Sequence, residues 1–183
     1  MSKEQKILIV DDSEMNRAIL TDILGGEYDI IEAENGVEGV ANIQKYGVEI
    51  ALVLLDVVMP VMDGFGVLDM MHKHRWIEDI PVIMISSESG SAFVERAYEL
   101  GVSDFISRPF DALVVHRRVV NTILLYAKQK KLISMVADQI YENEQQSTLM
   151  IDILSHIVEF RNGESGPHVR HVHTLSELLL TTL

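Results

Sequence analysis

Residues 54–64 read LLDVVMPVMDG, an apolar run that ends in a carboxylate and continues into a loop with one proline and one glycine. The apolar residues begin upstream, so that Ala51–Leu55 is short and continuously apolar. Such a stretch is typical of a strand that is covered on both faces of a sheet. Further short strand candidates precede and follow it, at Ile7–Val10, Asp29–Ala33, Val82–Ser86 and Asp104–Ile106.

Segments with helical spacing of apolar residues lie between these strands, at Glu14–Leu24, Val37–Tyr46, Gly64–His74 and Ser89–Leu100. Gly25, Gly47 and Gly101 fall where such helices would end. Strands that alternate with helices predict a parallel sheet built from right-handed crossovers. The sequence thus predicts an α/β fold with a five-stranded, doubly wound parallel sheet. Ligands of such folds bind at the carboxyl ends of the strands.

The pattern changes after Asp111, because no proline or glycine occurs from there to Phe160. Residues in this region recur in three- and four-residue steps, as in the heptad seam of a coiled coil. The members of this seam are Ile133, Val136, Ile140, Asn143, Ser147, Met150, Leu154 and Ile157. We therefore expect a long C-terminal coiled-coil helix that forms a homodimer. The alternative is a single helix that packs back on its own domain.

The composition is acidic, with 28 acidic and 15 basic side chains among 183 residues and a formal net charge of −13. A negative field of this size repels phosphate backbones, so we expect no nucleic-acid partner. The chain has no cysteine, which excludes disulfides and thiolate metal sites. The longest apolar run, Ile50–Leu55, is too short for a signal peptide or a membrane span. We expect a cytoplasmic protein that does not enter a membrane.

Three carboxylates follow two of the predicted strands. Asp11 and Asp12 come directly after the first strand, and Asp56 comes directly after the third. In a parallel sheet these positions converge at the carboxyl edge, where three ionised carboxylates need a cation or raised pKa values. Mg²⁺ is the usual cation where oxygen ligands and phosphate meet. For Asp12 or the neighbouring Ser13, capping the helix that starts near Glu14 is a simpler explanation.

Four stretches together resemble the response-regulator receiver family of two-component systems, in order and in spacing. They are residues 7–13 (ILIVDDS), 54–64 (LLDVVMPVMDG), 81–86 (PVIMIS) and 101–110 (GVSDFISRPF). The resemblance covers roughly residues 4–125 and implies a flavodoxin-like receiver domain. It implies that Asp56 accepts a phosphoryl group from a histidine kinase or a phosphotransfer protein and forms an acyl phosphate.

The resemblance also implies a magnesium site around Asp56. Asp12 and Asp56 would bind Mg²⁺ together with the backbone carbonyl of Val58, and Asp11 would act mainly through water. Enzymes that form an aspartyl phosphate and hydrolyse it are a competing class. They require a second aspartate two residues after the nucleophile, where this chain has Val58, so the sequence argues against this class.

Three further residues acquire roles from the resemblance. Ser86 would donate its hydroxyl to a phosphoryl oxygen, and Phe105 would turn inward when Ser86 moves. Taken alone, Ser86 could be a hydrogen-bonding residue at a strand end and Phe105 a core aromatic. Arg108 stands where the family usually has lysine, and its planar guanidinium does not replace an ammonium conservatively. A degenerate receiver, acting as a scaffold without phosphorylation, is therefore the alternative function.

Residues 159–170, EFRNGESGPHVR, resemble the opening of HD-GYP domains, which are bimetallic phosphodiesterases of cyclic di-GMP. By that resemblance Glu164 and His168 would be metal ligands, whereas an exposed turn with scattered histidines is the alternative. The rest of the family's motif is absent, so we do not expect this chain itself to act as a hydrolase. The expected organisation is a receiver domain at 1–125, a coiled-coil signalling helix at 126–160 and the shortened start of an HD-GYP-like output domain at 161–183.

Overall fold

The chain divides into two compact units, residues 1–128 and 129–183. The first unit contains a sheet of parallel strands. The structure is a computed structural model that describes residues 5–86 and 91–162. The strands in this part of the chain are β1 (Lys6–Val10), β2 (Asp29–Ala33), β3 (Ile50–Asp56), β4 (Val82–Ser86) and β5 (Asp104–Ser107). They lie in the order β2-β1-β3-β4-β5, and every neighbouring pair is parallel. The predicted five-stranded α/β fold is confirmed.

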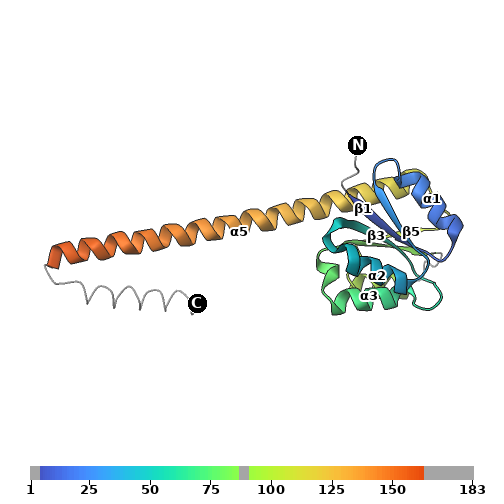
Figure 1. The fold of residues 1–183 in the computed structure, drawn as a ribbon, viewed down its shortest axis with the longest axis horizontal. Coiled ribbons are helices and arrows are strands. Elements are labelled where there is room, and N and C mark those ends of the chain that lie inside the picture. The colour runs from blue at the N-terminus through green and yellow to red at the C-terminus, as the bar shows by residue number, and fades with distance from the viewer. Residues whose placement is uncertain (1–4, 87–90, 163–183) are drawn as a thin grey trace. The chain divides into compact units, whose positions relative to one another are not determined.

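Helices alternate with the strands along the chain (Figure 1). They are α1 (Glu14–Leu24), α2 (Gly36–Tyr46), α3 (Gly64–Lys73), α4 (Ser91–Glu99) and α5 (Ala112–Asn162), with short 3₁₀ helices η1 (Gly47–Glu49) and η2 (Trp76–Glu78). The expected helix at Ser89–Leu100 is shorter than predicted, and its first two expected residues lie outside the described part of the chain. The long C-terminal helix is confirmed.

Polar side chains begin three of these helices. Ser13 accepts the N–H of Asn16 at the start of α1, and Asn35 accepts the N–H of Glu38 at the start of α2. At the start of α3, Asp63 accepts the N–H of Gly66. Such caps satisfy N–H groups that have no partner within the helix. Because Ser13 is the cap of α1, the neighbouring aspartates are not needed for this purpose.

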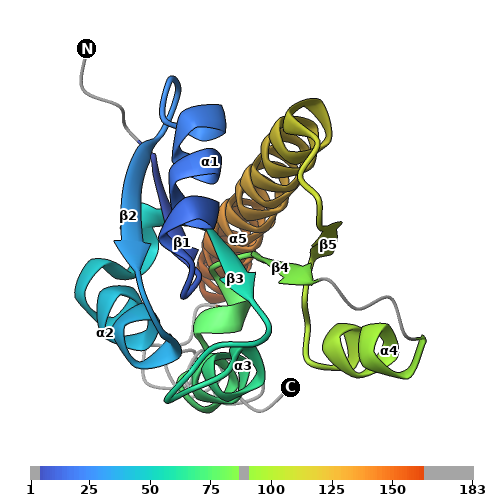
Figure 2. The same cartoon turned by 90° about the vertical axis from the view of Figure 1, so that its right-hand side faces the viewer.

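Helices lie on both sides of the sheet (Figure 2), and an apolar layer joins the sheet to the helices on each face. The layer on one face joins the sheet to α2, α3 and α4, and its helical members include Ile43, Val67, Leu68, Met71 and Ala97. The layer on the other face joins the sheet to α1 and the first part of α5, through Leu20, Leu24, Val115, Val119 and Ile123. Burial on both faces explains why the central strands are continuously apolar. The polar residues that end these strands are therefore left at the sheet edge.

The part of α5 in the second unit carries many exposed apolar side chains. All apolar members of the predicted seam are at least half exposed, namely Ile133, Val136, Ile140, Met150, Leu154 and Ile157. Asn143 and Ser147, the polar members, are exposed as well. Among the described residues, no helix is both long and apolar enough to cross a membrane.

Candidate functional site: an acidic cluster at the carboxyl edge of the sheet

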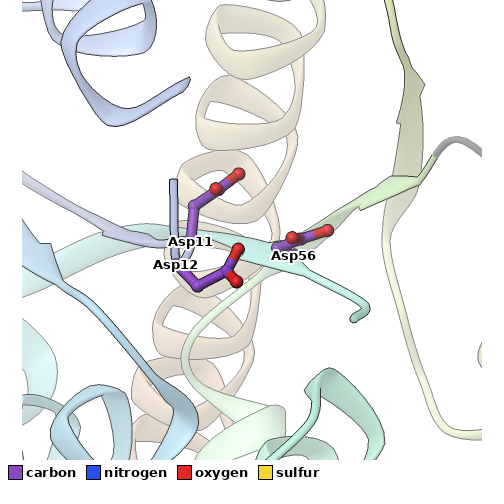
Figure 3. Close-up of side chains that lie close together, drawn as sticks. All are labelled: Asp11, Asp12 and Asp56. Carbon is purple, nitrogen blue, oxygen red and sulfur yellow. The ribbon is translucent and has the colours of Figure 1, made fainter. Parts of the chain in front are cut away.

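Asp11, Asp12 and Asp56 converge at the carboxyl edge of the sheet (Figure 3). Asp56 is the last residue of β3, and Asp11 follows the last residue of the neighbouring strand β1. One carboxylate oxygen from each of the three residues lies within 4.8 Å of the others. The strand order reverses between β1 and β3, and open α/β sheets bind ligands at such a switch point. The structure thus brings together the carboxylates that the sequence singled out.

Two of these carboxylates are buried. Asp11 is 0% exposed and Asp56 is 2% exposed, whereas Asp12 is exposed. The Asp11 carboxylate accepts the backbone N–H of Ser13 at 2.9 Å and the side-chain amide of Asn16 at 3.0 and 3.2 Å. Buried charges require such donors, because they have lost their water. These hydrogen bonds hold the Asp11 carboxylate in a fixed orientation.

The loop after β3 approaches the end of its own strand closely. A Cβ atom on Gly64 would lie 2.5 Å from the carbonyl oxygen of Asp56, so this position requires glycine. The N–H of Gly64 donates to the carbonyl of Val57 at 2.9 Å, and the N–H of Val57 donates to Asp56 Oδ1 at 2.7 Å. Val58, whose carbonyl is a predicted metal ligand, lies in this loop with its side chain exposed. The loop therefore fixes the Asp56 side chain through its first residue.

Arg108 places a positive charge between the two buried carboxylates. It follows β5, and its Nη2 atom lies 2.5 Å from Asp11 Oδ2 and 3.1 Å from Asp56 Oδ2. The side chain is only 25% exposed. Its Nε atom is buried and has no hydrogen-bond partner among the described residues. The sequence predicted a cation near the site but not that it would bridge Asp11 and Asp56.

The environment of Asp56 raises its pKa. Burial is the largest cause, because it disfavours the charged carboxylate, and the negative charge of Asp11 acts in the same direction. Arg108 and the hydrogen bond from Val57 lower the pKa of Asp56 without cancelling the rise. A further positive charge at this edge would therefore favour the ionised form of Asp56.

Arg17 on α1 belongs to the site although the sequence did not point to it. It is 7% exposed, and its Nη1 atom donates to the backbone carbonyl of Asp11 at 2.8 Å. It also pairs with Glu32 at 3.0 Å and with Glu34 at 3.5 Å, at the end of β2. Arg17 therefore ties the end of β1 to the end of β2. Arg17 and Asn16 both lie in the first turn of the helix that follows the acidic pair. This position was the signal available in the sequence.

Ser86 and Phe105 lie on the two strands beyond β3. Ser86 ends β4 and is 6% exposed, and its backbone carbonyl accepts the N–H of Arg108 at 3.2 Å. Phe105 is half-buried on β5, and its ring meets that of Tyr98 edge to face, with centroids 5.2 Å apart. The donor role of Ser86 and the switch role of Phe105 remain predictions.

The three carboxylates suit a hard divalent cation. Mg²⁺ in proteins is bound by one or two carboxylates, and water molecules complete its coordination. The buried Asp11 and Asp56 supply charge, and the exposed Asp12 lies where water can enter. Glu164 and His168, the predicted ligands of a second metal site, lie outside the described residues.

The fold and its acidic edge define a receiver domain of two-component signalling. Residues 7–120 match the family described as the response regulator receiver domain, and the chain belongs to this family. Receiver domains generally bind Mg²⁺ through an acidic pocket of this kind, and they interact with histidine kinases or phosphotransfer proteins.

Similar proteins include both single receivers and longer proteins. A probable cyclic di-GMP phosphodiesterase of Vibrio cholerae is 29% identical over 188 residues, which cover 96% of this chain and 42% of that protein. The chain thus spans less than half the length of this relative. A chemotaxis protein CheY homolog of Campylobacter jejuni is 34% identical over 116 residues, which cover 62% of this chain and 88% of that protein. Among solved structures, the CheX–CheY–BeF₃–Mg²⁺ complex of Borrelia burgdorferi matches with a TM-score of 0.59 and 33% identity, covering 64% of this chain and 87% of that one.

Proposed function

We propose that this chain is a phosphorylation switch in which Asp56 accepts a phosphoryl group from a histidine kinase or a phosphotransfer protein. Mg²⁺ would be held by Asp12, Asp56 and the backbone carbonyl of Val58, and Asp11 would act mainly through water. The observation that carries the proposal is the convergence of three carboxylates on the buried end of β3. The similar CheY of Borrelia burgdorferi, solved with BeF₃ and Mg²⁺, supports it.

The proposed reaction transfers the phosphoryl group directly. A carboxylate oxygen of Asp56 attacks the phosphorus of a phosphohistidine, a P–O bond forms, the P–N bond breaks, and the leaving imidazole takes a proton from water. Positioning and neutralisation of charge supply most of the catalysis in such transfers. Bound Mg²⁺ would neutralise charge on the phosphoryl oxygens. Val57 orients Asp56, and Ser86 and Arg108 would donate hydrogen bonds to the phosphoryl oxygens.

The switch would pass from the site to α4 and β5. In the proposed sequence, the hydroxyl of Ser86 moves towards the phosphoryl group and Phe105 turns inward after it. Phe105 contacts Tyr98 of α4, so this turn would break an aromatic contact at the surface. A change at that surface is what a partner or an output domain would detect.

We further propose an organisation in which residues 1–125 form the receiver domain, 126–160 a coiled-coil signalling helix and 161–183 the start of an HD-GYP-like output domain. The exposed seam on α5 supports a homodimer through this helix. The similar Vibrio cholerae protein, aligned over 96% of this chain, supports a cyclic di-GMP phosphodiesterase as the output, with Glu164 and His168 among its metal ligands. A kinase as phosphodonor would place this chain in the cytoplasm.

The phosphoacceptor is tested by incubating the purified chain with acetyl phosphate and Mg²⁺ and measuring its intact mass. We expect the wild-type protein to gain one phosphoryl group, and we expect EDTA or Asp56→Asn to abolish the gain. Asp69→Asn is the matched control, because Asp69 is an exposed aspartate on α3. A gain in Asp56→Asn would place the acceptor elsewhere. No gain in any protein would favour the alternative of a phosphorylation-independent scaffold.

A further inference from the structure

The side chain of Asn16 holds the Asp11 carboxylate from the first turn of α1. Its amide nitrogen, Nδ2, donates to Asp11 Oδ1 at 3.0 Å and to Asp11 Oδ2 at 3.2 Å. The backbone N–H of Ser13 donates to the same Oδ1 atom at 2.9 Å. Arg17, the next residue of α1, donates to the backbone carbonyl of Asp11 at 2.8 Å. One helical turn therefore holds both the backbone and the side chain of Asp11.

The neighbouring Asp12 lies in a different environment. Asp12 is exposed, whereas Asp11 is 0% exposed. A buried carboxylate with several hydrogen-bond donors has few other orientations, whereas an exposed carboxylate can turn towards a cation. One oxygen of Asp11 nevertheless lies within 4.8 Å of an oxygen of Asp12 and of Asp56. Its hydrogen bonds, more than its distance, therefore limit how closely Asp11 can approach a cation at this edge.

We propose that Asn16 is a positioning residue that sets the choice of cation. By holding Asp11, Asn16 keeps this carboxylate out of direct contact with the ion and so favours Mg²⁺ over Ca²⁺. The inference rests on the proposed function, because it takes the acidic cluster to be a metal site in which Asp11 acts through water. It adds a residue of α1 that determines which ion the site prefers.

The two ions differ in the number of protein oxygens that they take. Ca²⁺ accepts about six to eight oxygen ligands in flexible geometries, whereas Mg²⁺ keeps several water molecules and binds about one or two carboxylates directly. With Asp11 held, the site offers a cation two carboxylates for direct binding, those of Asp12 and Asp56, which suits Mg²⁺. A third carboxylate that is free to bind directly would stabilise bound Ca²⁺ more than bound Mg²⁺.

The helix does not need the Asn16 side chain for its own stability. Ser13 caps α1 by accepting the backbone N–H of Asn16, and this bond does not involve the side-chain amide. Asparagine is also a poorer helix former than alanine. Because the amide of Asn16 donates to Asp11, its replacement should change the freedom of Asp11 and leave α1 intact.

The experiment measures the dissociation constants of the whole chain for Mg²⁺ and for Ca²⁺ in separate calorimetric titrations. We expect Asn16→Ala to lower the ratio of the Ca²⁺ constant to the Mg²⁺ constant about tenfold, a change of the size that follows the loss of a hydrogen bond to a metal ligand. Asn16→Leu fills the space of the amide without a donor and should lower the ratio at least as much. Asn121→Ala is the matched control, because Asn121 is an exposed asparagine on α5, and it should keep the wild-type ratio.

The ratio separates a positioning role from a structural one. A variant that only loosens the fold weakens the binding of both ions alike, and urea unfolding in EDTA measures such loosening directly. If both Asn16 variants keep the wild-type ratio, Asn16 does not set the choice of cation and the inference is wrong. If the wild type binds neither ion, or if Asp56→Asn leaves binding unchanged, the proposed metal site itself is wrong and the inference falls with it.

Discussion

At the scale of single residues, Asp56 combines burial with the nucleophilic role that we propose for it. Burial raises the pKa of its carboxyl, and Arg108 offsets only part of the rise. The folded protein therefore binds a proton at Asp56 more tightly than the unfolded chain does. In the proposed reaction the charged form of Asp56 is the one that reacts, and it is also the form that burial disfavours, so the proposed function would come at the expense of stability.

Replacing Asp56 by asparagine should stabilise the metal-free protein at pH 7. The folded-state pKa lies above the ordinary value of 3.8, so Asp56 destabilises the fold increasingly as pH rises through the folded-state pKa and has no effect well below 3.8. Each tenfold change in proton affinity corresponds to about 1.4 kcal/mol. The advantage of Asp56→Asn should therefore shrink towards zero on acidification.

Urea unfolding in EDTA between pH 7 and pH 4, compared with the exposed control Asp69→Asn, measures this difference. An advantage that stays constant with pH, or a less stable Asp56→Asn protein at pH 7, would show that the Asp56 carboxylate is not destabilised by its surroundings.

Some residues of the site are visible in the sequence and others are not. Asp11 and Asp56 end apolar strands, so their convergence follows from the parallel sheet alone. Asn16 and Arg17 act through side chains that reach back from the first turn of α1, and no pattern of apolar residues reveals such contacts. The bridge made by Arg108 depends on the path of one side chain from the end of β5, which the sequence leaves open.

At the scale of elements, the strands and most helices follow from apolar patterning. β2, β4 and α1 have the bounds expected from the sequence. The short helices η1 and η2 were not expected, because three residues are too few to show a helical period. The bounds of the other described helices differ by a residue or two, where local capping rather than the apolar pattern decides the end.

The loop between β3 and α3 contains a strained residue, Val61. Its φ is 69°, and it stands at the centre of a tight turn in which the N–H of Met62 donates to the carbonyl of Pro60 at 2.8 Å. A β-branched side chain is disfavoured in this conformation. Val61 is 87% exposed, so packing does not explain the valine.

Val61→Gly should stabilise the protein by about 1 kcal/mol, because the relief of strain exceeds the entropy that glycine adds to the unfolded chain. Val48→Gly is the matched control: Val48 is 78% exposed and has an ordinary φ, so this change should destabilise. Chemical unfolding of the three proteins measures both effects. If both variants lose stability equally, Val61 is not strained.

The seam on α5 makes the helix itself testable. If the helix pairs with a second copy, Ile140 becomes buried, and Ile140→Glu should raise the dimer dissociation constant about a hundredfold or more, because an unpaired buried charge costs about 3 kcal/mol or more. Gln145→Glu adds the same charge to the same helix outside the seam and should leave the dimer intact. Light scattering over a concentration series measures the outcome, and a wild-type chain that stays monomeric at high micromolar concentration would exclude the coiled-coil dimer.

At the scale of the whole molecule, β5 connects the acidic site to α5 within the first unit. Arg108 follows the carboxyl end of this strand and enters the site. At the other end, Asp104 forms an ion pair with Arg118 of α5, and Ser103 donates a hydrogen bond to Tyr126 of α5 at 3.1 Å. A movement of Arg108 would therefore act on a strand that is tied to the first part of α5. The use of this link for signalling requires that Asp56, and no other carboxylate, takes the phosphoryl group.

The identity of that carboxylate can be measured directly by chemical trapping. Sodium borohydride reduces an acyl phosphate to an alcohol, so a phosphorylated aspartate becomes homoserine, which peptide mass spectrometry locates. After incubation with acetyl phosphate and Mg²⁺, we predict homoserine at position 56, and none when Mg²⁺ is withheld. Homoserine at Asp11 or Asp12 with unmodified Asp56 would contradict the assignment of Asp56 as the phosphoacceptor.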